Sequence, residues 1–100
     1  MRPHRYHSEA ETELLEQVSY YEAVSPGLGA NFLAEVKAAL ALAGDFPNSG
    51  SPYYSKTRRV FPKGFPYSLA YYERNTELIV MALASFSQKP GYWRNRRRET

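Results

Sequence analysis

Residues 58–72 read RRVFPKGFPYSLAYY, and this stretch decides the fold. Pro62-Lys63-Gly64 separates two aromatic-rich runs, which indicates a hairpin loop between two strands. The second run alternates, so its side chains should form two faces. One face carries Tyr67, Leu69 and Tyr71, and the other carries Ser68, Ala70 and Tyr72. We therefore predict a β-hairpin, with strands over 56–61 and 65–72 and two arginines at its mouth.

Two helices are predicted before this hairpin. Apolar residues recur at helical spacing from Ala10 to Tyr21 and predict a helix over 9–24, with Ser8 and Glu11 forming a capping box at its start. A second apolar stripe predicts a helix over 29–43, which Gly44 would end as its C-cap. The short break between them, at Ser25-Pro26-Gly27, implies an antiparallel helical hairpin. Four residues should pack between this hairpin and the sheet: Leu14, Val18, Phe32 and Val36.

The remaining segments complete an α+β pattern. Residues 2–7 could form a first strand, residues 48–54 read as a loop, and residues 73–76 read as a polar turn. The run LIVMALA over 78–84 is apolar at every position, which fits a central strand covered on both faces. Helices followed by strands indicate an α+β fold, with an N-terminal strand and a helical hairpin on one face of a small, mostly antiparallel sheet.

Length and composition bound the class of protein. One hundred residues suit a single domain over 1–100, whose basic tail, residues 94–100, is either frayed or a contact for nucleic acid or acidic protein. The chain has no cysteine, which excludes disulfides and thiolate metal sites and fits a cytoplasmic location. The first residues lack an apolar core, and no apolar run is long enough for a membrane helix, so we expect no signal peptide and no membrane partner.

Charge is divided unevenly along the chain. Residues 1–50 hold three basic and seven acidic residues, a net charge of −4, whereas residues 51–100 hold ten basic and three acidic residues, a net charge of +7. An acidic half joined to a basic half suggests one face built for an anionic partner. Two solvated surfaces of opposite sign are the alternative.

Several kinds of chemistry have no support in the sequence. No glycine-rich loop follows a strand, and no Ser-His-Asp set is present. His4 and His7 should point to opposite faces of a strand, which argues against a shared metal. Glutamates 9, 13 and 16 follow helical spacing and are expected to face solvent. We therefore expect no metal and no cofactor.

The positive signal is a set of cations interleaved with aromatic residues. Arginine can hold phosphate in a bidentate manner, and aromatic rings can stack on bases. The candidates for target binding are Arg58, Arg59, Lys63, Lys89, Tyr92, Trp93, Arg94 and Arg96. Tyr92 and Trp93 could equally pack the tail onto the sheet. For RNA cleavage, the candidate proton-transfer groups near these cations are few: Lys63, Tyr67 and Tyr92.

Three segments together resemble the RelE/ParE superfamily of bacterial type II toxins. They are YYE-x3-PGLG-x2-FL-x-EV (Tyr20 to Val36), FPY-x-L-x-Y (Phe65 to Tyr71) and PGYW-x2-R (Pro90 to Arg96). The resemblance implies a helical hairpin against a curved, mostly antiparallel sheet. It also implies a toxin that a cognate antitoxin neutralises. RelE-like members cut mRNA on the ribosome, and ParE-like members inhibit DNA gyrase.

The resemblance favours the ParE-like branch. Ser68 stands where RelE-like nucleases commonly have an arginine, Ser85 where many relatives have a histidine, and Gln88 where many have an arginine. Arg58 or Arg59 keeps the family's basic strand position. A nuclease would therefore depend on an incomplete set: Arg58, Arg59, Lys63 and Tyr92. This argues against an enzyme and for a gyrase inhibitor, with an mRNA endonuclease and an attenuated toxin that mainly binds its antitoxin as the alternatives.

The antitoxin of such a toxin would lie across its helices and sheet. The candidate contacts are Tyr21, Tyr67 and Tyr71, although Tyr67 and Tyr71 could instead belong to the core. We also expect an apolar groove that is exposed when the antitoxin is absent.

Overall fold

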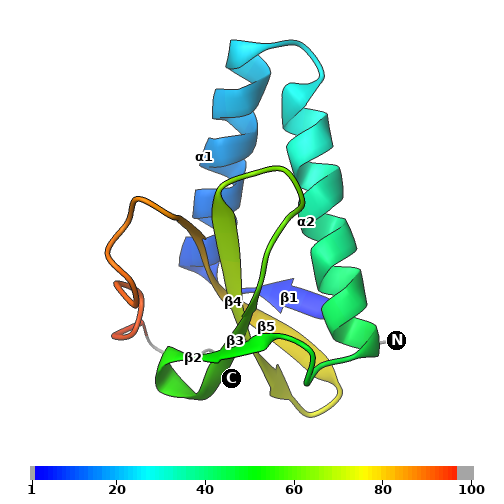
Figure 1. The fold of residues 1–100 in the computed structure, drawn as a ribbon, viewed down its shortest axis with the longest axis vertical. Helices are drawn as coiled ribbons and strands as arrows, with labels where there is room; N and C mark the ends of the chain where they lie inside the picture. The colour runs from blue at the N-terminus through cyan, green and yellow to red at the C-terminus, as the bar shows by residue number, and fades with distance from the viewer. Residues whose placement is uncertain (1, 97–100) are drawn as a thin grey trace.

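The computed structural model describes residues 2–96 and contains a sheet covered by two helices (Figure 1). In chain order the elements are β1 (His4–Tyr6), α1 (Ser8–Val24), α2 (Leu28–Asp45), β2 (Ser51–Tyr53), a 3₁₀ helix (Tyr54–Lys56), β3 (Thr57–Val60), β4 (Tyr67–Arg74) and β5 (Glu77–Ser85). The strand order is β1-β5-β4-β3-β2, with β1 parallel to β5 and every other pair antiparallel. The predicted α+β class and mostly antiparallel sheet are therefore confirmed.

The β4–β5 hairpin is the centre of the sheet. It pairs from Tyr67 opposite Ser85 to Arg74 opposite Glu77, and a left-handed Asn75 (φ 56°) turns the chain between the strands. Asparagine is one of the few residues besides glycine that adopts this conformation readily. β5 has β1 on one side and β4 on the other, so the apolar run over 78–84 is central, as predicted.

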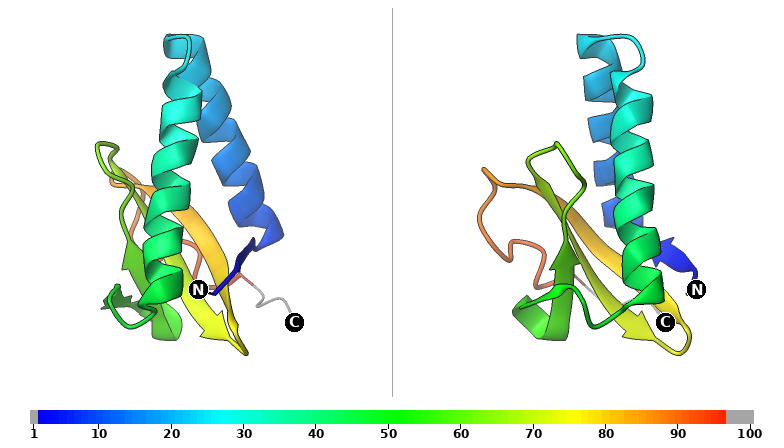
Figure 2. Two further views of the ribbon diagram at one scale, coloured as in Figure 1. Left: turned by 90° about the vertical axis from the view of Figure 1, so that its right-hand side faces the viewer. Right: turned by 45° about the vertical axis from the view of Figure 1, so that its right-hand side comes forward.

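The helical hairpin covers one face of this sheet (Figure 2). Its inward stripe is fully buried at Phe32, Val36 and Leu40 and nearly so at Leu14. These side chains form one cluster with Leu69, Tyr67, Val80 and Leu83 of the sheet, and Val18 packs against it partly buried. The predicted packing of the hairpin on the sheet is thus confirmed.

The other face of the sheet is covered by residues 86–96, which we call the C-terminal segment (Figure 2). Trp93, which is 2% exposed, packs there against Ala70, Met81 and Ala82. A register shift between Ala70 and Tyr71 marks a β-bulge in the β4–β5 pairing. Since a bulge interrupts the strict alternation of side chains, the neighbours Met81 and Ala82 can both join this second cluster.

The predicted helix caps are wrong at both helices. The N-cap of α1 is His7, whose Nδ1 accepts the Glu9 N–H at 3.1 Å. Its own N–H donates to the Val80 carbonyl at 2.9 Å, so the helix begins directly where the strand pairing ends. Gly44 lies inside α2, and Phe46 is the C-cap. A Cβ at Gly44 would lie 2.6 Å from the Arg2 carbonyl oxygen, so this glycine permits a close backbone approach.

The predicted loop over 48–54 contains a strand, β2. Its central residue is Pro52, which cannot donate a hydrogen bond and is tolerated because β2 is the outermost strand. The connection between β3 and β4 is also longer than the three residues predicted, since it runs from Phe61 to Pro66. Gly64, with φ 84°, supplies its left-handed position.

The core placement of Leu14 can be tested against its neighbour Leu15, which is 60% exposed. Leu14→Ala should lower the free energy of unfolding by roughly 2–5 kcal/mol, because it removes buried methyl groups and leaves a cavity. Leu15→Ala should change it by less than about 0.5 kcal/mol. Urea unfolding monitored by circular dichroism measures both. A loss below about 1 kcal/mol for Leu14→Ala would contradict this placement.

Candidate functional site

A cleft of about 340 Å³ lies on the sheet face that the helices do not cover. Tyr53, Arg59 and Phe61 form its wall on the β2–β3 side, and Ser68 and Ser85 come from β4 and β5. The C-terminal segment supplies the opposite wall through Phe86, Gln88, Lys89, Pro90, Gly91 and Trp93. The cleft therefore depends on the sheet and on the correct position of this segment.

Arg59 is the central cation of the cleft. Its guanidinium carbon lies 4.1 Å from the centre of the Tyr53 ring and 5.3 Å from that of Phe61, so two aromatic rings restrict its orientation. Its Nε is buried and makes no hydrogen bond with the described residues. A guanidinium that two rings hold in one orientation is suited to donate to an anionic group.

The cleft suits anion binding better than proton transfer. Lys89 adds a second cation to Arg59, and Ser68 and Ser85 add hydroxyl groups. None of the described residues that line the cleft is a histidine, aspartate or glutamate. Ser68, Ser85 and Gln88, where the family resemblance led us to expect arginine or histidine in a nuclease, all line this one cleft.

The side chains of the two adjacent arginines of β3 lie on opposite faces of the sheet. Arg59 pairs with Ala70, whose side chain belongs to the cleft face, whereas Arg58 pairs with Tyr71, whose side chain faces the helices. Arg58 Nη1 donates to the Gly50 carbonyl at 2.8 Å and so supports the loop that precedes β2. Lys63 is exposed in the β3–β4 loop and does not line the cleft.

The remaining cations and Trp93 belong to the C-terminal segment. Trp93 is in the core, so it packs the segment onto the sheet. Arg94 is exposed, and its guanidinium carbon lies 5.1 Å from the centre of the Tyr54 ring. Residues 97–100, which include two arginines of the predicted basic tail, lie outside the described residues.

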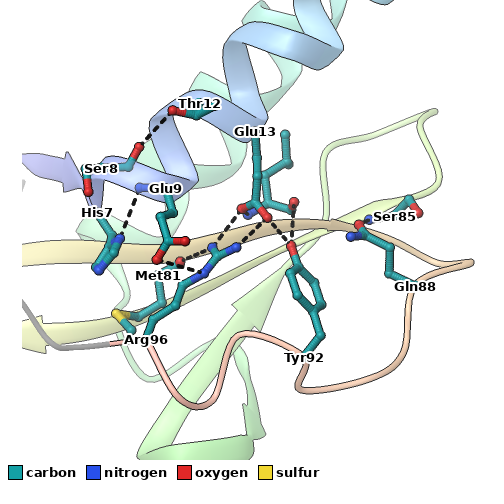
Figure 3. Close-up of polar contacts among 11 residues, drawn as sticks. His7, Ser8, Glu9, Thr12, Glu13, Met81, Ser85, Gln88, Tyr92 and Arg96 are labelled. Atoms are coloured by element: carbon teal, nitrogen blue, oxygen red, sulfur yellow. Dashed lines mark hydrogen bonds and ion pairs between the residues drawn. The ribbon is translucent and has the colours of Figure 1, made fainter.

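Tyr92 and Arg96 turn away from the cleft toward Glu13 of α1 (Figure 3). The Glu13 carboxylate accepts from the Tyr92 hydroxyl and from both terminal nitrogens of Arg96, at 2.9 and 2.7 Å. The prediction that Glu13 faces solvent is therefore wrong. Its position next to the buried Leu14, at the border of the apolar stripe, was the available signal.

Tyr92 is poorly suited to act as a base. Burial and the adjacent Glu13 carboxylate raise the pKa of Tyr92 far above its usual range, so its phenol stays protonated. Of the four residues on which a nuclease would depend, Arg59 alone lines the cleft.

The three tyrosines considered for antitoxin contact lie on the helix side of the sheet. Tyr67 and Tyr71 are 7% and 1% exposed, and their hydroxyls donate to Gln17 Oε1 at 2.5 Å and to the Pro47 carbonyl at 2.9 Å. Tyr21 is partly buried against Phe32. A groove of about 270 Å³ lies between α2 and β3, lined by the apolar Ala39, Leu42, Val60 and Phe61 together with Ser49, Gly50, Ser51 and Arg59. This is an exposed apolar groove of the expected kind.

Two further features of the described residues bear on function. Within residues 2–96, no three histidine, aspartate or glutamate side chains are grouped so that they could hold a metal ion. Neither described helix is both long and apolar enough to cross a membrane.

The pH dependence of stability should reveal the buried phenol of Tyr67. Burial, and secondly a hydrogen bond with Tyr21, raise the pKa of Tyr67 to about 12. In the unfolded chain this phenol should lose its proton near pH 10, so its contribution to stability is complete below that pH and falls as the pH rises toward 12. The free energy of unfolding of the protein minus that of Tyr67→Phe should therefore be constant below about pH 10 and should decrease as the pH rises toward 12. A difference that stays constant up to pH 12 would contradict it.

Comparison with known families agrees with the fold and the motifs. The family model described as the ParE toxin of type II toxin-antitoxin system, parDE, matches residues 5–90. This range extends from β1 through both helices and the remaining strands into the C-terminal segment. No curated protein matches the chain. Because the match spans most of the chain, the protein belongs to the ParE toxin family of type II toxin–antitoxin systems.

Proposed function

We propose that this toxin stops growth by binding and inhibiting DNA gyrase and that it does not cut nucleic acid. The observation that supports this most strongly is the composition of the cleft. By the family resemblance, Ser68 stands where RelE-like nucleases commonly have an arginine, Ser85 where many relatives have a histidine, and Gln88 where many have an arginine. All three line the cleft. The cations of the cleft therefore lack the groups with which such relatives cleave RNA.

Metal-free cleavage of RNA makes three chemical demands. It needs a base for the 2′-hydroxyl, an acid for the leaving oxygen, and cations for the charge that develops on phosphorus. Arg59 and Lys89 could meet the last demand. The Tyr92 hydroxyl is bound to Glu13 and is held protonated by its raised pKa. This combination supports binding of an anionic surface over catalysis.

The rim of the cleft has the composition of a protein-binding surface. Phe61 and Phe86 are 45% and 62% exposed, and their rings meet edge to face with centres 6.0 Å apart. Phe61 lies beside Arg59, whose guanidinium carbon is 5.3 Å from the centre of the Phe61 ring, and exposed Lys89 lies in the same wall as Phe86. Aromatic and arginine side chains dominate the energy of protein interfaces. Acidic residues on gyrase would complement these cations, and such a target places the toxin in the cytoplasm.

A cognate antitoxin would neutralise the toxin, as membership of a type II system implies. We propose that it covers the apolar groove between α2 and β3, where Leu42 is 56% exposed and Phe61 reaches from the groove to the cleft rim. An apolar antitoxin segment that lies in this groove would bury both side chains. It would thereby remove Phe61 from the surface offered to gyrase.

Substitution of Arg59 tests the proposed function. Arg59→Gln should raise the concentration of purified protein that half-inhibits gyrase supercoiling by about tenfold or more, as loss of an interface hot spot would. The matched control is Arg5→Gln, because Arg5 is an exposed arginine that pairs with Glu77 at the opposite edge of the sheet. The control should inhibit as the unmodified protein does. In cells, DNA synthesis should fail before protein synthesis, and the antitoxin should restore growth.

Two results would contradict the proposal. Early failure of protein synthesis with mRNA cut on the ribosome would establish the endonuclease instead. Normal growth of cells that contain the folded protein would identify an attenuated toxin.

A further inference from the structure

One edge of β5 is open beyond the end of β1. The parallel pairing of β1 ends at Val80, and the His7 N–H then makes a last bond to the Val80 carbonyl. From Met81 onward, this edge has no neighbouring strand among the described residues. The unpaired edge of an apolar strand exposes backbone groups to which another chain can pair.

Side chains of α1 and the C-terminal segment make hydrogen bonds to the backbone of β5 along this open edge, as a neighbouring strand would (Figure 3). The Glu13 carboxylate accepts the Leu83 N–H at 3.1 Å, and Arg96 Nη1 donates to the Met81 carbonyl at 2.9 Å. The Tyr92 hydroxyl lies 3.4 Å from the Leu83 carbonyl oxygen. An acceptor and a donor thus face the strand where a partner strand would place its own carbonyl and N–H.

The same side chains bind one another strongly. Arg96 and Glu13 form a two-pronged pair, with side chains that are 12% and 18% exposed, and the Glu9 carboxylate lies 3.7 Å from Arg96 Nε. Bidentate geometry and partial shielding from water make such a pair stronger than an ordinary surface ion pair. Removal of the Glu13 carboxylate would leave Arg96 with only the more distant carboxylate of Glu9, and it would take the acceptor from the Leu83 N–H.

This pair fixes the far end of the C-terminal segment. At its near end, the Phe86 N–H donates to the Pro66 carbonyl at 2.9 Å, and Trp93 anchors the middle in the core. Lys89, between these points, belongs to the wall of the cleft, whereas Glu13 does not line the cleft. Glu13 can therefore influence the cleft through the position of the segment.

We propose that Glu13 is a positioning residue of the toxin: with Arg96 it closes the open edge of β5 and holds the C-terminal segment where it forms the wall of the cleft. The effect on inhibition rests on the proposed function, but the closure of the edge does not. The partner that this surface accepts is the protein's own C-terminal segment.

Hydrogen exchange measured by NMR tests the closure directly. Glu13→Gln keeps an oxygen that can accept the Leu83 N–H but loses the charge that holds Arg96. Exchange of amides in the C-terminal segment, and of the Leu83 amide that this segment shields, should therefore become about tenfold faster, a factor that corresponds to about 1.4 kcal/mol. The amide of Val36, in the buried helix–sheet core, should exchange as before. Glu16→Gln is the matched control, because Glu16 is exposed on the same helix, and it should change neither rate.

A charge reversal separates edge closure from simple attraction of charges. Glu13→Arg combined with Arg96→Glu keeps an ion pair, but the new arginine cannot accept the Leu83 N–H and the new glutamate cannot donate to the Met81 carbonyl. The double variant should therefore exchange at least as fast as Glu13→Gln. Unchanged exchange in Glu13→Gln, or protection restored by the reversal, would overturn the closure of the edge.

The gyrase assay decides the functional part separately. Glu13→Gln should raise the half-inhibiting concentration severalfold, although residue 13 lies outside the cleft, and Glu16→Gln should leave it unchanged. Faster exchange with unaltered inhibition would overturn the positioning role and leave the closure intact. If the unmodified protein does not inhibit gyrase, the proposed function fails, and the exchange experiment still decides whether Glu13 holds the segment.

Discussion

The complete covering of β5 is the constraint on which the rest of the structure depends. This strand is apolar along most of its length, so water must be excluded from both of its faces and its backbone groups need partners along both edges. The helical hairpin covers one face and the C-terminal segment covers the other. β4 pairs with one edge, and β1 pairs with the first part of the other.

The proposed target surface arises where this covering ends. Past Ala84 the strand leaves the core, and the C-terminal segment folds back to form a wall opposite Arg59. The cleft therefore has a rigid floor of paired strands and a wall supplied by a segment without regular secondary structure. A binding surface of this construction can vary in sequence while the sheet beneath it remains the same.

The acidic and basic halves of the chain are joined within the fold. Arg96 pairs with Glu13, Arg5 pairs with Glu77, and Arg2 pairs with Glu73, and each of these ion pairs connects one half with the other. Of these three pairs, only Arg96–Glu13 neutralises an excess charge of each half, because Arg2 and Arg5 are cations of the acidic half and their partners are anions of the basic half. Arg59, Lys89 and Arg94 are in no ion pair within the described structure and remain available to the proposed target surface. The set of cations that could meet an anionic partner is therefore smaller than the composition suggests.

The sequence predicted the elements that repeat a simple pattern. Helical spacing located both helices, and an unbroken apolar run located β5, because each pattern reports burial of the element itself. Strand alternation could also have separated Arg58 from Arg59, since neighbours in a strand face opposite ways. The observed pairing shows this separation directly.

The features that the sequence did not predict depend on distant partners. Gly44 looked like a helix end, but its role is set by the backbone of Arg2. β2 was hidden by Pro52, whose place in a strand is acceptable because the strand is at the edge. Glu13 looked solvated because its partners, Tyr92 and Arg96, are far away in sequence. Local patterns carry no information about such contacts.

The central claim is that the toxin meets gyrase through the cleft face of its sheet. Hydrogen–deuterium exchange of the toxin, measured by mass spectrometry with and without gyrase, tests this most directly. The account predicts that gyrase protects peptides covering residues 59–61 and 84–91 and leaves the outer surface of the helical hairpin unchanged. Protection confined to α1 and α2, with these peptides unaffected, would contradict it.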